Sequence, residues 1–305
     1  MGNPLLDISA VVPEKELQKW GAKLGDAMLA DAQKHTPMYA DLVKNYDVEY
    51  IAGGATQNSI RVAATLLKST SVNCGYIGCI GKDKFGEQLK KSAAEAGVQA
   101  LYLEDEKTPT GMFFFFYQLI PTQQNSSNNN NNNNNNRNMR GSEHMTRPEV
   151  KRAIESASTY YVSGFFLTVS VPAILKVAEH AAKMNKVFSF NLAAPFLMQV
   201  PVFGDAMEKV LPYCDIVFGN ETEAEAFAQR FMKKKATSAE VAKYISGLKK
   251  VNSNRPRVCC ITQGSTATVV SVNGADAQSF PVRKLDKKLI VDTNGAGDAF
   301  VGGFF

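Results

Sequence analysis

The stretch most capable of chemistry is Asp292–Asp298, read DTNGAGD, which follows the apolar residues 289–291. Gly295 and Gly297 permit close backbone approach to a ligand, and Asp298 stands where a helix is expected to begin. Backbone N–H groups at a helix N-terminus favour an anion, and an acid in the same turn can accept a proton from an alcohol. The pattern therefore suits a turn that holds a transferred phosphoryl group beside a general base. The alternative is a glycine-rich turn capped by Asp298 with no ligand.

Two further stretches carry polar residues at turns. IAGGATQNSIRVAATLL, from Ile51, predicts a turn at Gly53–Gly54 before an amphipathic helix, with Asn58 in its first turn. GNPLLDIS, from Gly2, places Asp7 after two leucines, where its two carboxylate oxygens can accept hydrogen bonds from a vicinal diol. Taken singly, each residue is better explained by a local role, Asn58 as a hydrogen-bond partner and Asp7 as a turn or capping residue.

These stretches lie in a chain that alternates apolar segments with helical patterns. Residues 72–81 predict a strand, the following segment up to Gly97 a helix, and residues 98–103 the next strand. The same order returns between residues 160 and 262. Strand, helix and strand in succession indicate a parallel sheet covered by helices, so we expect an α/β fold.

Composition excludes several classes of function. A net charge of +5 over 305 residues, with basic and acidic stretches interspersed, argues against nucleic-acid binding. Five cysteines without paired spacing and three scattered histidines predict reduced thiols and no zinc site. The N-terminus lacks signal-peptide character, and the apolar run from Met112 is too short to span a bilayer. We expect an intracellular protein of the cytoplasm, with the nucleus as a further compartment.

Together, the motifs resemble the ribokinase-like (PfkB) family of sugar kinases, and within it the adenosine kinase subfamily. The matching blocks include GNPLLDISAVV, EYIAGGATQNSI, GFFLTVS, NLAAPF, GNETEA, ITQG and DTNGAGDAFVGGF. The resemblance implies one kinase domain over residues 1–305, with a three-layer α/β fold whose mostly parallel central sheet is flanked by helices. It also implies a small β lid built from about residues 8–52 and 108–147.

The resemblance further implies transfer of a phosphoryl group from ATP to the 5′-hydroxyl of adenosine, giving AMP and ADP, by a monomer that uses Mg²⁺ and binds neither nucleic acid nor membrane. The family's site residues fall on Asp298 as catalytic base; Asn294, Gly295, Ala296 and Gly297 as anion hole; Asn3, Asp7, Gly54 and Asn58 around the ribose; Phe166 on adenine; Thr262 and Gly264 near the ATP phosphates; and Asn220 and Glu223 organising Mg²⁺ through water. A capping box is a second, compatible interpretation of Asn220 and Glu223.

The sequence departs from the family pattern in three places. An apolar strand before GNPLLD is absent, and the helix opened by Asp298 is expected to extend beyond Phe305, so we expect a chain truncated at both ends. Residues 122–145 form an asparagine-rich insert that predicts a disordered surface loop. This insert replaces a returning lid strand and its arginine, for which Arg137 or Arg140 are candidates. Two alternatives therefore stay open: a catalytically impaired nucleoside-binding relative, and a PfkB kinase for another sugar or nucleoside.

Overall fold

The computed structural model describes residues 1–20, 38, 41, 43–117, 144–286 and 293–305. Asp292, Arg137, Arg140 and the strand predicted at 289–291 lie outside the described residues. Of the insert predicted at 122–145, only His144 and Met145 are described. Both are buried, and His144 Nε2 lies 3.0 Å from the carbonyl oxygen of Leu101.

The largest sheet of the described residues has six strands in the order β11-β10-β9-β8-β7-β6. Neighbouring strands from β6 to β9 are parallel, and β10 is antiparallel to both β9 and β11. The bounds are β6 (Thr159–Ser163), β7 (Val187–Asn191), β8 (Ile216–Asn220), β9 (Val258–Thr262), β10 (Ala267–Val272) and β11 (Gln278–Pro281). The mostly parallel central sheet predicted from the alternating pattern is confirmed.

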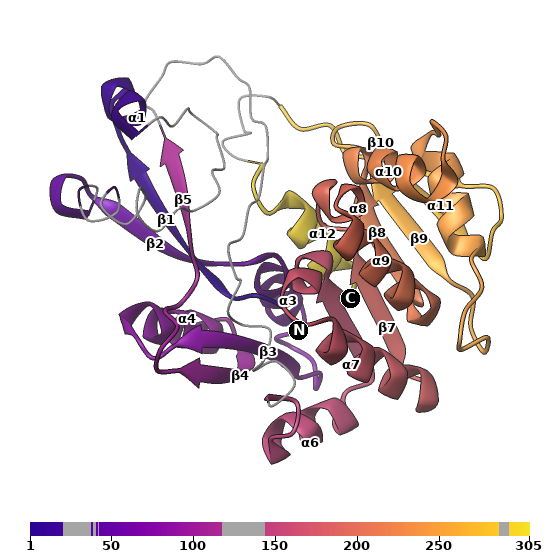
Figure 1. Cartoon of the computed structure of the whole chain (residues 1–305), viewed down its shortest axis with the longest axis horizontal. Coiled ribbons are helices and arrows are strands. Elements are labelled where there is room, and N and C mark those ends of the chain that lie inside the picture. The colour runs from indigo at the N-terminus through magenta and orange to yellow at the C-terminus, as the bar shows by residue number, and fades with distance from the viewer. Residues whose placement is uncertain (21–37, 39–40, 42, 118–143, 287–292) are drawn as a thin grey trace.

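Successive residues of a strand point to opposite faces of the sheet, and here both faces carry apolar side chains. Helices therefore cover both faces. Val217 and Cys259 face a large core built with the helices on one side, whereas Phe218 and Cys260 face the C-terminal helix on the other. All five cysteines are free thiols, as predicted. The first set comprises α7 (Val171–Lys183), α8 (Phe196–Gln199), α9 (Pro201–Val210), α10 (Glu221–Phe227) and α11 (Ser238–Gly247); the opposite helix is α12 (Ala296–Phe304). The three-layer arrangement is visible in Figure 1.

A parallel pair of strands, β3 (Cys74–Gly81) and β4 (Val98–Asp105), lies beside the large sheet and is connected by α4 (Lys84–Glu95). This is the strand–helix–strand unit predicted from residues 72–103. The N-terminal residues bridge the two sheets, since the Met1 amino group donates to Tyr161 O and Gly2 N–H donates to Ile77 O. Helix α6 (Pro148–Ser156) precedes β6.

A third sheet projects away from the body in the order β2-β1-β5 (Figure 1). Strand β1 (Leu5–Val11) pairs antiparallel with β2 (Val48–Gly53) and parallel with β5 (Met112–Tyr117), and α1 (Glu14–Trp20) follows β1. Helix α3 (Ala55–Leu66) runs from β2 back to the body. These strands occupy the segments predicted to form the lid, and their role as a lid stays a prediction. No helix in the described ranges is long and apolar enough to cross a bilayer.

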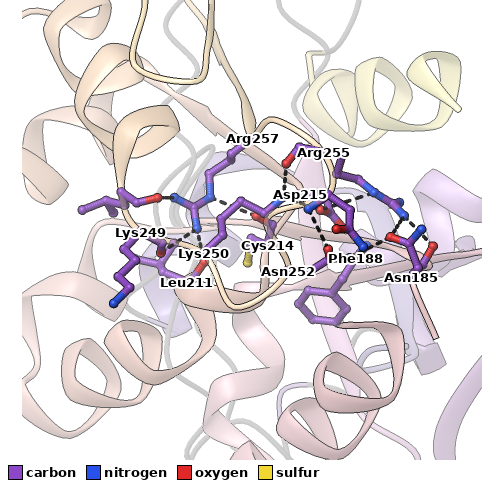
Figure 2. A network of polar contacts seen from close by, with 12 residues as sticks. Asn185, Phe188, Leu211, Cys214, Asp215, Lys249, Lys250, Asn252, Arg255 and Arg257 are labelled. Carbon is purple, nitrogen blue, oxygen red and sulfur yellow. Dashed lines mark hydrogen bonds and ion pairs between the residues drawn. The ribbon is translucent and has the colours of Figure 1, made fainter. Parts of the chain in front are cut away.

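A buried polar network ties together the N-terminal ends of β7, β8 and β9 (Figure 2). Arg257 has no exposed surface, and its guanidinium donates to five main-chain carbonyls, those of Leu211, Cys214, Ile245, Leu248 and Lys249. Beside it, Asp215 accepts from Phe188 N–H and pairs with Lys250. Buried polar groups without partners are costly, so Arg257 stabilises this end of the sheet by satisfying several carbonyls at once.

We expect Arg257→Lys to lower the free energy of unfolding by about 2–3 kcal/mol, because an ammonium has three donors and leaves carbonyls unpaired. Urea unfolding measures the loss. Arg255→Lys is the matched control: half-buried Arg255 bonds Asn185 in the same network, and its replacement should cost less than about 1 kcal/mol. Equal losses in the two variants would contradict a special role for Arg257.

Candidate active site

A cavity of about 1390 Å³ opens where the six-stranded sheet, the β2-β1-β5 sheet, α3 and α12 meet. The last residues of four parallel strands line it: Ser163, Asn191, Asn220 and Thr262. Ligands of open α/β sheets bind at the carboxyl ends of the strands, so this edge is the expected place for a site. Single small-molecule sites measure roughly 300–1,000 Å³, and this volume has room for two small ligands.

Asp298 lies in the first turn of α12, half-buried and facing the cavity. Asn58 Nδ2 donates to Asp298 Oδ2 at 3.0 Å, which joins two motifs 240 residues apart. The helix begins after Gly295, whose φ of 73° is left-handed and suits glycine. Residues 293–297 also line the cavity, so the anion-hole segment and the carboxylate face the same space.

Asp7 reaches this space from β1. A Cβ on Gly53 would lie only 1.9 Å from Asp7 Oδ2, so the carboxylate packs directly against that glycine. Gly54 adopts a φ of 95°, and a Cβ there would lie 2.3 Å from the carbonyl oxygen of Asn3. The glycine pair therefore lets β2 turn into α3 tightly enough to bring Asp7, Asn58 and Asn3 to one wall, and all three line the cavity.

Asn220 and Glu223 form the capping box of α10 as well as a cavity wall. Asn220 Oδ1 accepts from Glu223 N–H at 2.9 Å, and the Glu223 carboxylate accepts from the main-chain N–H and side-chain amide of Asn220 at 3.0 Å each. Glu223 is 5% exposed. Each carboxylate oxygen retains a further lone-pair site, which suits a hydrogen bond from metal-bound water.

Burial raises the pKa of each of three cavity carboxyls to about 7: Asp7, Glu223 and Asp298. The charge of Asp298 raises the pKa of Asp7 further, whereas Arg61 lowers it. The hydrogen bond from Asn58 favours the ionised form of Asp298 and opposes the effect of burial. A base with a pKa near the working pH is suited to proton transfer.

Two residues predicted at the site, Phe166 and Gly264, are not among the residues that line this cavity. Phe166 is buried in the main hydrophobic core, and the neighbouring Phe165 lines the cavity with Phe196, their ring centroids 6.3 Å apart. Gly264 adopts a φ of 54° in the turn after β9 and is not part of the cavity wall, whereas Thr262 is. The assignments of Phe166 to adenine and Gly264 to ATP stay predictions.

The structure adds residues that motif reading passed over. Ser163 and Asn191 line the cavity from the ends of β6 and β7, where they are paired in register, and Arg61 lines it from α3. Asn191 Oδ1 accepts from Ala193 N–H, and Ala193, another wall residue, has a φ of 70°. The sequence offered one signal for Ser163 and Asn191: each is the polar last residue of an apolar strand.

The family model for pfkB family carbohydrate kinases matches residues 15–305. The chain belongs to this family. It is 46% identical to adenosine kinase 1 of Arabidopsis thaliana, over the whole of this chain and 85% of that protein, and 39% identical to adenosine kinase of Schizophyllum commune, over the whole of this chain and 86% of that protein.

Solved structures agree with this assignment. The crystal structure of Anopheles gambiae adenosine kinase in complex with P1,P4-di(adenosine-5) tetraphosphate aligns with a TM-score of 0.85 and 40% identity, over 99% of this chain and 86% of that one. Apo adenosine kinase of Trypanosoma brucei brucei also aligns with a TM-score of 0.85, at 31% identity, over 99% of this chain and 89% of that one. The ribokinase-like fold predicted from the resemblance is confirmed.

In this PfkB protein the position of Asp298 depends on how closely α12 packs against α3. A Cβ on Gly302 would lie 2.4 Å from Ser59 O and 2.7 Å from Val62 Cβ, so only glycine fits there. The preceding residue, Val301, is buried against Phe218 of β8. The contact therefore fixes the helix that carries Asp298 to the helix that carries Asn58.

We expect Gly302→Ala to force α12 away from α3, lowering the free energy of unfolding by about 1–3 kcal/mol and reducing turnover through the displaced Asp298. Gly303→Ala is the control, since the nearest atom to its Cβ is Leu66 Cδ1 at 4.0 Å. Thermal unfolding and initial rates measure both effects. If the two variants behave alike, close helix packing does not position Asp298.

Proposed function

We propose that this chain is an ATP-dependent kinase that phosphorylates the 5′-hydroxyl of adenosine, giving AMP and ADP. The observation that carries the proposal is the hydrogen bond from Asn58 to Asp298, which brings the helix-start carboxylate and the Asp7 wall into one cavity. The relatives named above are adenosine kinases, and the chain matches them over nearly its whole length.

Asp298 acts as the general base. Its carboxylate accepts the proton of the 5′-hydroxyl as the oxygen forms a bond to the γ-phosphorus of ATP, and the bond from that phosphorus to the β–γ bridging oxygen breaks to release ADP. Main-chain N–H groups at the start of α12 favour the negative charge of the migrating group. Because such transition states are loose and charged, positioning and electrostatics supply most of the catalysis.

Asp7 and Asn58 hold the ribose. The two oxygens of an ionised Asp7 can each accept a hydrogen bond, one from the 2′-hydroxyl and one from the 3′-hydroxyl. Asn3 lies on the same wall, with Nδ2 3.5 Å from Phe165 O, and Phe165 offers an aromatic surface for the base. An aromatic surface beside the diol-binding residues favours a nucleoside over free ribose.

Asn220 and Glu223 fit an indirect role for Mg²⁺. Both residues line the cavity, and Glu223 keeps lone-pair sites beyond its bonds to Asn220. Mg²⁺ retains several waters in proteins, so this pair would hold the hydrated ion through water. When bound with ATP, the ion neutralises charge on the phosphate oxygens.

Formation of AMP from adenosine by the purified full chain, dependent on both ATP and Mg²⁺, tests the proposal. Parallel assays with inosine and ribose test the choice of substrate. Calorimetric binding of adenosine without any turnover would instead assign the chain as a nucleoside-binding relative. Turnover of ribose in preference to adenosine would assign another PfkB activity.

We also propose that the protein is a cytoplasmic monomer. Light scattering coupled to size-exclusion chromatography tests the monomer, and imaging of the tagged chain tests the compartment. A dimer or an organellar signal would contradict the respective part.

A further inference from the structure

Strand β6 is the edge strand of the six-stranded sheet, and segments from elsewhere in the chain bond its main-chain groups. The N–H of Ser163 donates to Thr56 Oγ1 at 3.3 Å, and the carbonyl oxygen of Tyr161 accepts from the Met1 amino group at 2.7 Å. An edge strand leaves a row of donors and acceptors unpaired unless something covers it. Here the start of α3 and the N-terminal residues supply that cover.

The hydroxyl of Thr56 joins the two covering segments to each other. Besides accepting from Ser163 N–H, it donates to the carbonyl oxygen of Met1 at 3.3 Å, and the residue is 3% exposed. A Cβ on Gly2 would lie 2.4 Å from Thr56 Oγ1 and 2.7 Å from Thr56 Cβ, so residues 1–3, the N-terminal strap, pack directly against this side chain. Thr56 belongs to the cavity wall, but its one hydroxyl donor is already used within the protein.

The N-terminal strap leads straight to two of the residues assigned to the ribose. One is Asn3 itself, whose Nδ2 lies 3.5 Å from Phe165 O and whose carbonyl oxygen packs against Gly54. The other is Asp7, on the strand β1 that begins two residues after Asn3. Both line the cavity, so the placement of the strap decides how this wall meets a ligand.

We propose that Thr56 is a positioning residue for this wall: its hydroxyl clamps the N-terminal strap to β6 and so holds Asn3 and Asp7 in their ligand-binding positions. The inference rests on the proposed function for the identity of the ligand. Without the clamp, only a fraction of the molecules has the wall in place, and the apparent Kd rises by the inverse of that fraction. The transfer step should stay intact once the ligand is bound, because Asp298 is held separately on α12.

The test compares Thr56→Val, which removes the hydroxyl from a side chain of nearly the same shape, with Thr56→Ser, which keeps the hydroxyl. For Thr56→Val we expect the Kd and KM for adenosine to rise about five- to tenfold, the worth of one neutral hydrogen bond. The kcat and the KM for ATP should change by less than about twofold, whereas a general loss of structure would alter both. Thr56→Ser should restore most of the affinity.

Thr70→Val is the matched control. The Thr70 hydroxyl also donates once, to Leu67 O at 2.7 Å, and accepts once, from Val72 N–H at 3.2 Å, but the residue is exposed and outside the cavity wall. Its variant should keep the parent constants. Gly2→Ala is a second route to the defect, since the added Cβ would collide with Thr56 and displace the strap. Because both changes release one clamp, the rise in Kd in the double variant should be smaller than the product of the single rises.

A measurement without ligand separates the inference from the function. Gly2 N–H donates to Ile77 O at 3.2 Å, a bond that Thr56→Val does not remove directly. In the ligand-free protein, the exchange rate of this amide with solvent, followed by NMR, should rise by at least about fivefold in Thr56→Val and stay at the parent value in Thr70→Val. That result supports the clamp even if adenosine is not the substrate. Equal exchange rates in the two variants, or an unchanged Kd in Thr56→Val when the parent protein binds adenosine, would overturn the proposal.

Discussion

Asp298→Asn should reduce the kcat for AMP formation by about 10³-fold, within the 10²–10⁴ range typical of removing a general base. An amide cannot accept the 5′-hydroxyl proton, yet it keeps an oxygen able to receive the hydrogen bond from Asn58. The local geometry of α12 should therefore survive. Rapid-mixing or initial-rate assays with saturating ATP, Mg²⁺ and adenosine measure the loss.

Stability is the control for this variant. Burial raises the pKa of Asp298 to about 7, above its unfolded value of about 3.9, so between these pH values the folded state holds a proton that the unfolded state has released. Its contribution favours folding at acidic pH and is lost as the pH rises through 7. Asp298→Asn should then be at least as stable as the parent protein at alkaline pH and bind adenosine with similar affinity. Retention of most of the kcat would show that another group is the base.

Asp7→Asn is expected to lower kcat/KM for adenosine by about 10²–10³-fold, because one acceptor of the carboxylate becomes a donor against the ribose diol. Most of the loss should appear in KM, since the diol contact is made in both the ground state and the transition state. Steady-state assays at fixed saturating ATP separate the two constants.

A comparison ligand sharpens the Asp7 experiment. With 2′-deoxyadenosine, which lacks one of the paired hydroxyls, the parent protein and Asp7→Asn should differ far less than they do with adenosine. Asp286→Asn, a carboxylate outside the cavity wall, should leave both substrates unaffected. A loss of the same size for both nucleosides would assign Asp7 to a role other than holding the diol.

Much of this site could be predicted from local sequence. Glycines with positive φ mark turns, and Gly54 and Gly295 indeed sit at the helix starts that bring Asn58 and Asp298 to the cavity. The central sheet could be predicted because short, mostly apolar segments alternate with helical patterns along the chain. In the structure the middle residues of β7, β8 and β9 are all buried, as expected for parallel strands covered on both faces.

The rest depends on packing that no local pattern encodes. Adjacent Phe165 and Phe166 are identical residue types that share one hydrophobic core, and the turn of 3₁₀-helix Gly164–Thr168 decides that Phe165 also lines the cavity. The close contact at Gly302 joins segments about 240 residues apart, so its need for glycine appears only once α3 and α12 are placed together. The charges that act on Asp7 also come from segments far from it in the sequence, so their balance depends on the tertiary structure.

The central claim, that the Asp298 carboxylate takes the 5′-hydroxyl proton during phosphoryl transfer, is tested most directly by the pH dependence of a single turnover. With enzyme in excess over adenosine and saturating ATP and Mg²⁺, the rate constant for AMP formation should be level above about pH 7 and fall at least tenfold per pH unit below it, as Asp298 becomes protonated. In Asp298→Asn the same profile should be low and should lose the part of the fall that Asp298 contributes, leaving the part due to Asp7 and Glu223. A rate constant in the parent protein that does not change from pH 5.5 to pH 8.5 would contradict the account.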